Sequence, residues 1–127
     1  MALILDANAL SAAADQAPSI IQVLAGAIEL AIPVPALGEH RYGISLSRYQ
    51  SRYSSWLDGL LRDTRVLEID EETTSAYAEI RVERRRVRRP IPTNDLWIAA
   101  LCRQHAMALL SRDEHFDVVP GMKRLSW

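Results

Sequence analysis

The sequence predicts an α/β fold with a mostly parallel central sheet and helices on both of its faces. Short continuous apolar runs, at residues 2–5 and 107–110, are typical of strands buried on both sides. Between these runs, apolar residues recur at helical spacing in segments bounded by proline and acidic residues. Because strands that alternate with helices form parallel sheets through helical crossovers, this order of elements favours an α/β layered architecture.

The first half of the chain is expected to contain two strands. Residues 2–5 form the first strand, and a helix follows it. Residues 18–31 begin with proline and carry isoleucine and leucine at helical spacing, which predicts a helix. Residues 32–34 are then a short strand, and Pro35 begins the next helix. Residues 49–63 carry aromatic residues and leucine on one helical face and predict another helix.

The second half repeats the alternation of strand and helix. Arg65–Ile69 alternates polar and apolar residues, which predicts a strand. Asp70 caps the following helix through an acidic first turn, and Pro90 ends that helix. The remaining expected elements are a helix capped by Thr93 or Asn94 that runs to about His105, a strand at 107–110, and edge fragments at 118–119 and 124–125.

The length and the composition of the chain limit the classes of protein to which it can belong. The 127 residues, 49% of them hydrophobic, fit one soluble globular domain that spans residues 1–127. No apolar run approaches the ~20 residues of a membrane span, and Asp6 interrupts an N-terminus that has no basic leader, so neither a membrane protein nor a signal peptide is expected. The single cysteine, Cys102, excludes an internal disulfide and fits the reducing cytoplasm.

Positive charge is distributed unevenly along the chain. Residues 1–40 contain no Lys or Arg, and 14 of the 15 basic residues are Arg. Six Arg lie within the nine residues 81–89. This arginine strip is interpreted as a surface that contacts phosphate groups, with a solvated helix end as the alternative. A GC-rich genome also favours Arg over Lys, but it does not explain why these residues cluster.

Four acidic residues lie near expected strand ends or helix starts: Asp6, Glu39, Asp95 and Asp113. In a parallel sheet such positions converge on one edge, where α/β folds bind their ligands. Carboxylate oxygens without cysteine are the donors that Mg²⁺ and Mn²⁺ prefer, and ions held in this way can activate water against a phosphodiester. Taken singly, each acid is more simply explained as a turn or helix cap.

Four segments resemble those of the PIN-domain ribonucleases, and most closely the VapC-type toxins of bacterial toxin–antitoxin pairs. They are Leu5–Asn8, Leu37–Gly43, Pro92–Ala100 and Leu110–Asp117, and they occur in the family's order and spacing. The resemblance covers nearly the whole chain. It implies a PIN-like α/β/α sandwich and a metal-dependent endoribonuclease that cleaves RNA with Mg²⁺ or Mn²⁺. Ala7 and His40 depart from the family pattern, but neither departure removes an acid.

The resemblance also assigns roles to individual residues. Asp6, Asp95 and Asp113 are the expected metal ligands, and Glu39 binds a second ion or orients the attacking water. The expected products carry 5′-phosphate and 3′-hydroxyl ends. The residues expected to support the metal or the phosphate are Asn8, Ser111 and Asp117. The pattern of positive charge, and not the resemblance, gives the residues expected to contact RNA: Arg41, Arg84, Arg85, Arg86, Arg88, Arg89 and Arg112. For Arg41 and Arg112, which lie beside expected ligands, the alternative is that they balance the charge of the acids.

The implied partners are an RNA substrate, an antitoxin whose tail covers the active-site groove, and a second copy of the chain in a homodimer. The aromatic helix from Tyr49 to Leu61 is the candidate edge of that groove. The main alternative is a non-catalytic PIN-like domain that binds RNA or protein, against which the four acids argue. A haloacid-dehalogenase-like phosphatase fits poorly because position 8 is Asn8, and a response-regulator receiver fits poorly because Lys123 is the only lysine.

Overall fold

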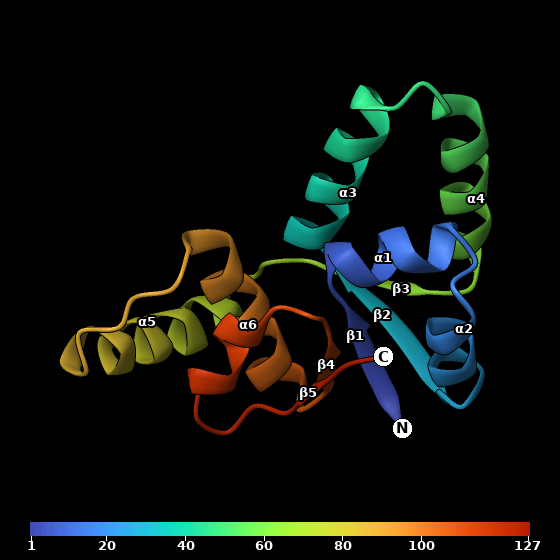
Figure 1. Ribbon diagram of the computed structural model, residues 1–127. Helices are drawn as coiled ribbons and strands as arrows, with labels where there is room; N and C mark the ends of the chain where they lie inside the picture. Colours follow the sequence, from blue (N-terminus) through green and yellow to red (C-terminus); the bar gives the residue numbers. More distant parts are fainter.

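The computed structural model describes residues 1–127 and contains one parallel sheet with helices around it (Figure 1). None of its helices is long and apolar enough to cross a membrane. The single parallel sheet with helices around it confirms the expected α/β fold with a mostly parallel sheet. The strands are β1 (Ala2–Leu5), β2 (Glu29–Pro33), β3 (Arg65–Leu67), β4 (Ala108–Leu110) and β5 (Arg124–Leu125), and the helices are α1 (Ala7–Ala14), α2 (Pro18–Ala25), α3 (Val34–Leu46), α4 (Gln50–Arg62), α5 (Glu71–Arg86), α6 (Thr93–His105) and the short 3₁₀ helix η1 (Glu114–Val118).

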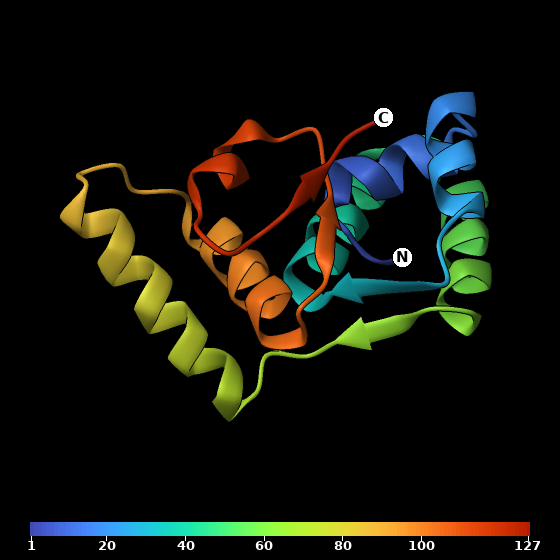
Figure 2. The same cartoon turned by 90° about the horizontal axis from the view of Figure 1, so that it is seen from below.

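The sheet lies between two layers of helices, as Figures 1 and 2 show. Ile4 faces a core shared with α5 and α6, which includes Leu101. Its neighbours Leu3 and Leu5 face the opposite core, which includes Leu10 of α1. Successive side chains of a strand point to opposite faces, so a central strand covered on both sides needs apolar residues at every position. This explains the continuous apolar run at the N-terminus.

The strand order places β1 at a switch point of the sheet. The order is β3-β2-β1-β4-β5, with every pairing parallel. The chain therefore leaves β1 toward one edge through β2 and β3, and returns on the other side through β4 and β5. Open α/β sheets bind ligands beyond the carboxyl ends of the strands where the order reverses. Asp6 follows β1 and Ser111 follows β4 at this point.

The structure corrects the expected bounds of the first half of the chain. α2 ends at Ala25 rather than at residue 31, and Gly26 is its C-cap. β2 begins at Glu29 because the register pairs Glu29 with Ala2 of β1, so strand pairing overrides the helical spacing of this segment. Val34 belongs to α3 and not to the strand.

The caps of the last two long helices differ from each other. Asp70 caps α5 as expected, in a capping box with Thr73. The expected cap of α6 is wrong, because its N-cap is Pro92 and neither Thr93 nor Asn94 caps the helix through its side chain. The Asn94 amide instead contacts an acid of α3, as described below.

The C-terminal segment contributes the last edge of the sheet. Arg124–Leu125 form β5, which pairs with β4, and this confirms one of the two expected edge fragments. The other fragment, at 118–119, is not a strand, because Val118 ends η1 and Val119 caps it. Phe116 of η1 is buried against the α5 and α6 side of the sheet, so this segment packs on the core through an apolar side chain.

Candidate active site

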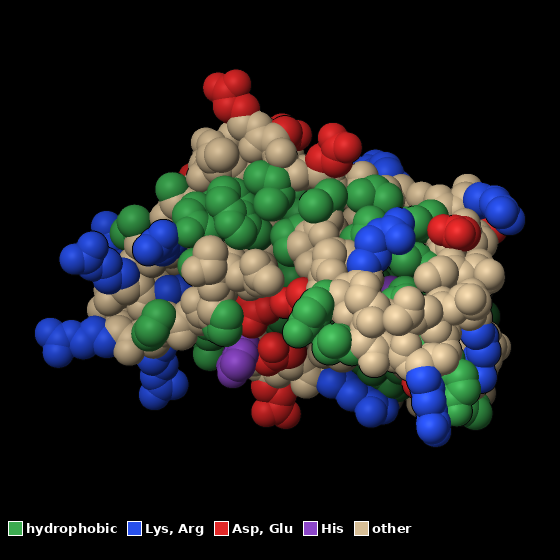
Figure 3. Space-filling model, turned by 90° about the horizontal axis from the view of Figure 1, so that it is seen from above, with side chains coloured by type: hydrophobic (Ala, Val, Ile, Leu, Met, Phe, Trp, Pro, Cys, Tyr) green, Lys and Arg blue, Asp and Glu red, His purple; other side chains and the backbone are tan.

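An open cavity of about 640 Å³ lies beyond the carboxyl ends of β1 and β4. Viewed from above the sheet, acidic side chains gather in its hollow, with histidine beside them (Figure 3). The four acids singled out in the sequence all line it, although they come from positions spread over more than 100 residues of the chain. The lining residues are Asp6, Ala7, Asn8, Glu39, Pro92, Thr93, Asn94, Asp95, Asp113 and His115.

Asp6 is the most deeply placed of these acids. It is the N-cap of α1, where its Oδ1 accepts a hydrogen bond of 2.8 Å from the backbone N–H of Ala7. Its Oδ2 accepts one of 2.7 Å from the Ser111 hydroxyl. Burial raises the pKa of Asp6, the hydrogen bonds from Ser111 and Ala7 oppose this rise, and the charges of Glu39 and Asp113 add to it. The same carboxylate thus caps helix α1 and lines the acidic cavity.

Ser111 and Asn8 form a small polar network behind the acids. The Ser111 hydroxyl accepts hydrogen bonds from the Asn8 side-chain amide (3.2 Å) and from the backbone N–H of Asp113 (3.0 Å). The carbonyl oxygen of the Asn8 side chain accepts one of 3.2 Å from the backbone N–H of Arg112. The network joins the start of α1 to the loop after β4, so it holds Asp6 and Asp113 on the same side of the cavity.

Asp95 carries the largest electrostatic cost of ionisation in the site. It lies in the first turn of α6 with a side chain only 14% exposed. Burial first, and then the charges of Asp113, Asp6 and Glu39, raise its pKa to about 6 from the usual 3.8, while a hydrogen bond from His115 lowers it. Crowded carboxylates without a nearby cation raise one another's pKa in this way, so the site is built for a positive charge.

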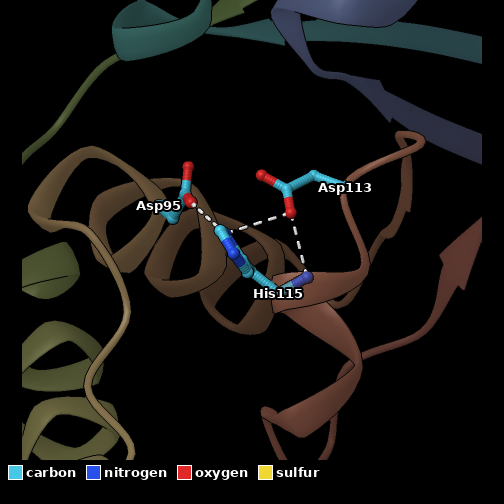
Figure 4. Close-up of side chains that lie close together, drawn as sticks. All are labelled: Asp95, Asp113 and His115. Atoms are coloured by element: carbon cyan, nitrogen blue, oxygen red, sulfur yellow. Dashed lines mark hydrogen bonds and ion pairs between the residues drawn. The ribbon is translucent and has the colours of Figure 1, made fainter.

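Asp113 and His115 complete the acidic face of the cavity (Figure 4). Asp113 caps η1, and its Oδ1 accepts a hydrogen bond of 2.9 Å from the backbone N–H of His115. The ring Nδ1 of His115 lies 3.1 Å from Asp113 Oδ1 and 3.7 Å from Asp95 Oδ2. One donor atom from each of these three residues lies within 4.8 Å of the others.

Glu39 faces the cavity from α3 and is held by Asn94. The Asn94 side-chain amide donates a hydrogen bond of 3.1 Å to Glu39 Oε1. This contact crosses from the first turn of α6 to the third helix of the chain. From the sequence, Asn94 is only a candidate cap of α6, because its contact with Glu39 depends on a helix far away in the chain.

The donor set fits a hard divalent cation. Asp6, Asp95 and Asp113 offer carboxylate oxygens that converge on one cavity, and the pKa of Asp95 is raised first by burial and then by the negative charges of its neighbours, while no Lys or Arg lines the cavity. Mg²⁺ and Mn²⁺ bind such oxygen-rich sites, and His115 would be a compatible additional ligand for Mn²⁺.

Two of the residues expected to assist the site lie elsewhere. Asp117 does not line the cavity, because both of its carboxylate oxygens accept hydrogen bonds of 2.8 Å from Arg124 of β5. This ion pair lowers the pKa of Asp117 and fastens η1 to the sheet edge. Arg112 also turns toward the C-terminus, where its guanidinium lies 4.5 Å from the ring centroid of Trp127.

The arginine strip divides between two sides of α5. The buried Arg84 and the exposed Arg81, Arg85 and Arg88 line one pocket between α5 and the start of α6. Arg86 lines a different depression, beside Glu83. Arg41 and Arg89 are exposed.

Comparison with known proteins agrees with this architecture. Residues 3–122 match the family model described as PIN domain. Ribonuclease VapC4 of Mycobacterium tuberculosis is 29% identical over 102 residues, which cover 75% of each chain. Ribonuclease VapC5 of the same organism is 27% identical over 94 residues, 72% of this chain and 70% of the relative.

Solved structures show the same fold. A crystal structure of VapBC2 from Rickettsia felis, bound to a DNA fragment from its promoter, matches with a TM-score of 0.87 and 26% identity over 100% of this chain and 99% of the other. The DNA-bound VapBC of Salmonella typhimurium matches with a TM-score of 0.87 and 22% identity over 100% and 98%. The family match, the parallel sheet and the acidic cavity at its switch point lead to one conclusion: the chain belongs to the PIN-domain family, and the relatives it resembles are of the VapC type.

Proposed function

We propose that this protein is a metal-dependent endoribonuclease and the toxin of a toxin–antitoxin pair. The observation that carries the proposal is the convergence of Asp6, Glu39, Asp95 and Asp113 on one open cavity. Two relatives named as VapC ribonucleases support the reaction class. A non-catalytic binding domain would not need four acids whose mutual repulsion costs stability.

In the proposed reaction, Asp6, Asp95 and Asp113 hold Mg²⁺ or Mn²⁺. A divalent ion bound there would supply the Lewis acidity that in-line hydrolysis of a phosphodiester needs, and the expected products carry 5′-phosphate and 3′-hydroxyl ends. Glu39, positioned by Asn94, orients the attacking water or takes part in binding a second ion. Ser111 and Asn8 keep Asp6 and the loop of Asp113 in place, so they act as positioning residues.

The proposed substrate surface is basic and flanks the cavity. The strip provides the positive charge: Arg84, Arg85 and Arg88 line the pocket at the start of α6, Arg86 and Arg89 lie outside that pocket, and Arg41 adds charge from α3. Arg112 contributes less, because it is engaged with Trp127. Such a surface would attract the phosphate backbone whatever its base sequence.

The proposed antitoxin site is a second cavity, of about 390 Å³, between α1, α3 and α4. It shares Asn8 and Glu39 with the acidic cavity, so a peptide that occupied it would block access to the acids. Tyr53 forms its edge on α4 and donates a hydrogen bond of 2.6 Å to Asp15. The helix from Tyr49 to Leu61, which contains Tyr53, is the candidate edge of the antitoxin groove from the sequence. Structures of VapBC complexes among the relatives support a protein partner of this kind.

The central test is cleavage of single-stranded RNA by the purified protein, with Mn²⁺, Mg²⁺ or EDTA. We expect cleavage with either metal and none in EDTA, and loss of cleavage in Asp6→Asn and Asp95→Asn. Asp117→Asn is the matched control, because it removes an acid outside the cavity, and it should retain activity. Full activity in EDTA, or an undiminished Asp6→Asn/Asp95→Asn double variant, would contradict the proposal.

The partner and the dimer need separate measurements. Expression of the chain alone should arrest growth and translation, and co-expression of a cognate antitoxin should relieve the arrest. Normal growth with an enzyme that cuts cellular RNA freely would leave the toxin assignment without support. Light scattering of the purified chain should give the mass of a homodimer, about twice 14.3 kDa.

A further inference from the structure

We infer that the pocket between the C-terminal end of α5 and the start of α6 is a phosphate-binding subsite for the RNA strand, built around the buried guanidinium of Arg84. The inference rests on the proposed ribonuclease function and adds a defined contact to it. The pocket has a volume of about 630 Å³. Its lining residues are Arg81, Arg84, Arg85, Arg88, Pro90, Ile91, Thr93 and Leu96.

Arg84 is an unusual residue within this fold. It is only 8% exposed, and its Nε and Nη1 atoms are buried without a hydrogen-bond partner. The two half-buried arginines of the protein are both paired, since Arg103 contacts Glu83 and Arg124 contacts Asp117. A buried charge without a partner destabilises the folded protein, and a ligand that accepts its hydrogen bonds removes this cost.

The surroundings of Arg84 make that ligand an anion. Arg81, Arg84 and Arg85 lie at helical spacings that place them on one side of α5, Arg88 lies in the turn after the helix, and no acid lines the pocket. None of these four arginines forms an ion pair within the protein. A guanidinium binds phosphate oxygens through its N–H groups, and two of the three guanidinium nitrogens of Arg84, Nε and Nη1, have no hydrogen-bond partner in the protein.

The position of the pocket identifies the anion as a phosphate of the substrate strand. Thr93 lines both this pocket and the acidic cavity, so the two sites are contiguous. Basic side chains cluster at the α5 end of the molecule, beside the acidic hollow (Figure 3). A strand whose scissile phosphate occupied the acidic cavity would place a neighbouring phosphate against Arg84. An acidic segment of a protein partner is the competing occupant, and the test below separates the two.

The decisive variant is Arg84→Met, which keeps an unbranched aliphatic stem and removes the charged guanidinium. Because Arg84 has unpaired buried nitrogens, we expect the melting temperature to stay the same or rise. The affinity for a single-stranded RNA oligonucleotide in EDTA should fall about tenfold. The slope of log affinity against log salt should decrease by about 0.7, the value for one lost phosphate contact on a single strand.

Arg86→Met is the matched control, since Arg86 lies on α5 outside the pocket. It removes one charge from the same helix, and it should change the affinity less than Arg84→Met. Arg88→Ala tests the pocket at an exposed position where folding is not at risk, and it should weaken binding in the same direction.

A chemical probe then tests whether one defined phosphate is bound. Oligonucleotides with a single neutral methylphosphonate at successive positions should include one position that weakens binding by wild type about tenfold. At that position the Arg84→Met variant should show no further loss, because both changes remove the same contact.

Three results would overturn the inference. The first is a marked fall in the melting temperature of Arg84→Met with unchanged RNA affinity, and the second is an equal loss of RNA affinity in Arg84→Met and Arg86→Met. The third is a methylphosphonate effect on RNA affinity that is additive with Arg84→Met at every position. Unchanged RNA affinity together with lost binding of the antitoxin would assign the pocket to the protein partner. Metal-dependent cleavage by wild type is measured in parallel, so a failed subsite is distinguished from a failed ribonuclease assignment.

Discussion

The carboxylate of Asp6 accepts a hydrogen bond of 2.7 Å from the hydroxyl of Ser111, a residue 105 positions further along the chain. Both groups are buried, and they join the carboxyl ends of β1 and β4. The bond therefore fixes the orientation of an acid at the point of the sheet where ligands bind in this class of fold.

Replacing Ser111 by alanine should weaken both the fold and the site. Asp6 loses a donor that lowers its pKa, so we expect that pKa to rise further. Because a raised pKa makes ionisation costly in the folded state, the free energy of unfolding at pH 7 in EDTA should fall by roughly 1–3 kcal/mol, and the loss should shrink in acid. Urea unfolding of wild type and Ser111→Ala at pH 7 and at an acidic pH measures the difference in the free energy of unfolding. Ser45→Ala, at an exposed helical serine, should change stability by less than about 0.5 kcal/mol.

Replacing Asp95 by asparagine should stabilise the metal-free protein while it abolishes cleavage. Folding raises the pKa of Asp95 from 3.8 to about 6, so the folded state binds its proton more tightly. Its ionisation therefore costs stability as the pH rises through this interval, and the full cost is present at pH 7. After solvent screening, we expect a gain of roughly 2 kcal/mol in EDTA at pH 7 and almost none at pH 4.

The same experiment has a control of opposite sign. The pKa of Asp117 is lowered by Arg124, so its charge favours the folded state above the usual pKa. Asp117→Asn should therefore lower the melting temperature in EDTA at pH 7. If Asp95→Asn also lowers it, the four acids do not share a pocket as the structure has them.

Divalent metal should raise the melting temperature of wild type and do so less for Asp95→Asn or Asp113→Asn. An ion that binds only the folded state stabilises it by mass action. Thermal melts at millimolar Mn²⁺ and Mg²⁺ measure the effect. A wild-type melting temperature that does not move with millimolar metal would contradict the metal site.

Metal affinity should depend on pH through Asp95. An ion displaces the proton of this carboxyl, whose pKa is about 6 in the metal-free protein. The affinity for Mn²⁺ should be nearly constant above pH 7 and fall about tenfold per pH unit well below pH 6. Calorimetric titrations at several pH values, in buffers of different ionisation enthalpy, give both the affinity and the proton released. An affinity that does not change between pH 5 and 7 would show that Asp95 is not a ligand.

Asn94→Ala separates a helix cap from a positioning residue. Loss of a capping side chain costs about 1 kcal/mol, but Asn94 caps nothing in the structure. We therefore expect the stability to change by less than about 0.5 kcal/mol, while kcat falls roughly tenfold because Glu39 loses its hydrogen-bond donor. Asn94→Asp has the same shape but repels Glu39, and it should reduce kcat further. If Asn94→Ala instead lowered the free energy of unfolding by the about 1 kcal/mol of a lost cap and left kcat unchanged, the interpretation of Asn94 as a helix cap would be restored.

Local sequence patterns were sufficient to predict the structure of those segments whose conformation depends mainly on their own residues. The apolar run before Asp6 predicted a buried central strand, and the acidic turn after Asp70 predicted a capped helix. The order of elements likewise predicted a parallel sheet, and the position of the acids after strands predicted that they would meet. They share a cavity because parallel strands end at one edge.

The sequence by itself determined the class of fold, the four converging acids and the presence of a basic strip. Only the tertiary structure decided that β2 begins at Glu29, that Asp117 pairs with Arg124, that Asn94 holds Glu39, and that Arg84 is buried without a partner. The physical reason is the range of the interactions. Hydrophobic periodicity and capping act over a few residues, whereas strand register, side-chain pairing and burial depend on elements that are distant in the chain and meet only when it folds.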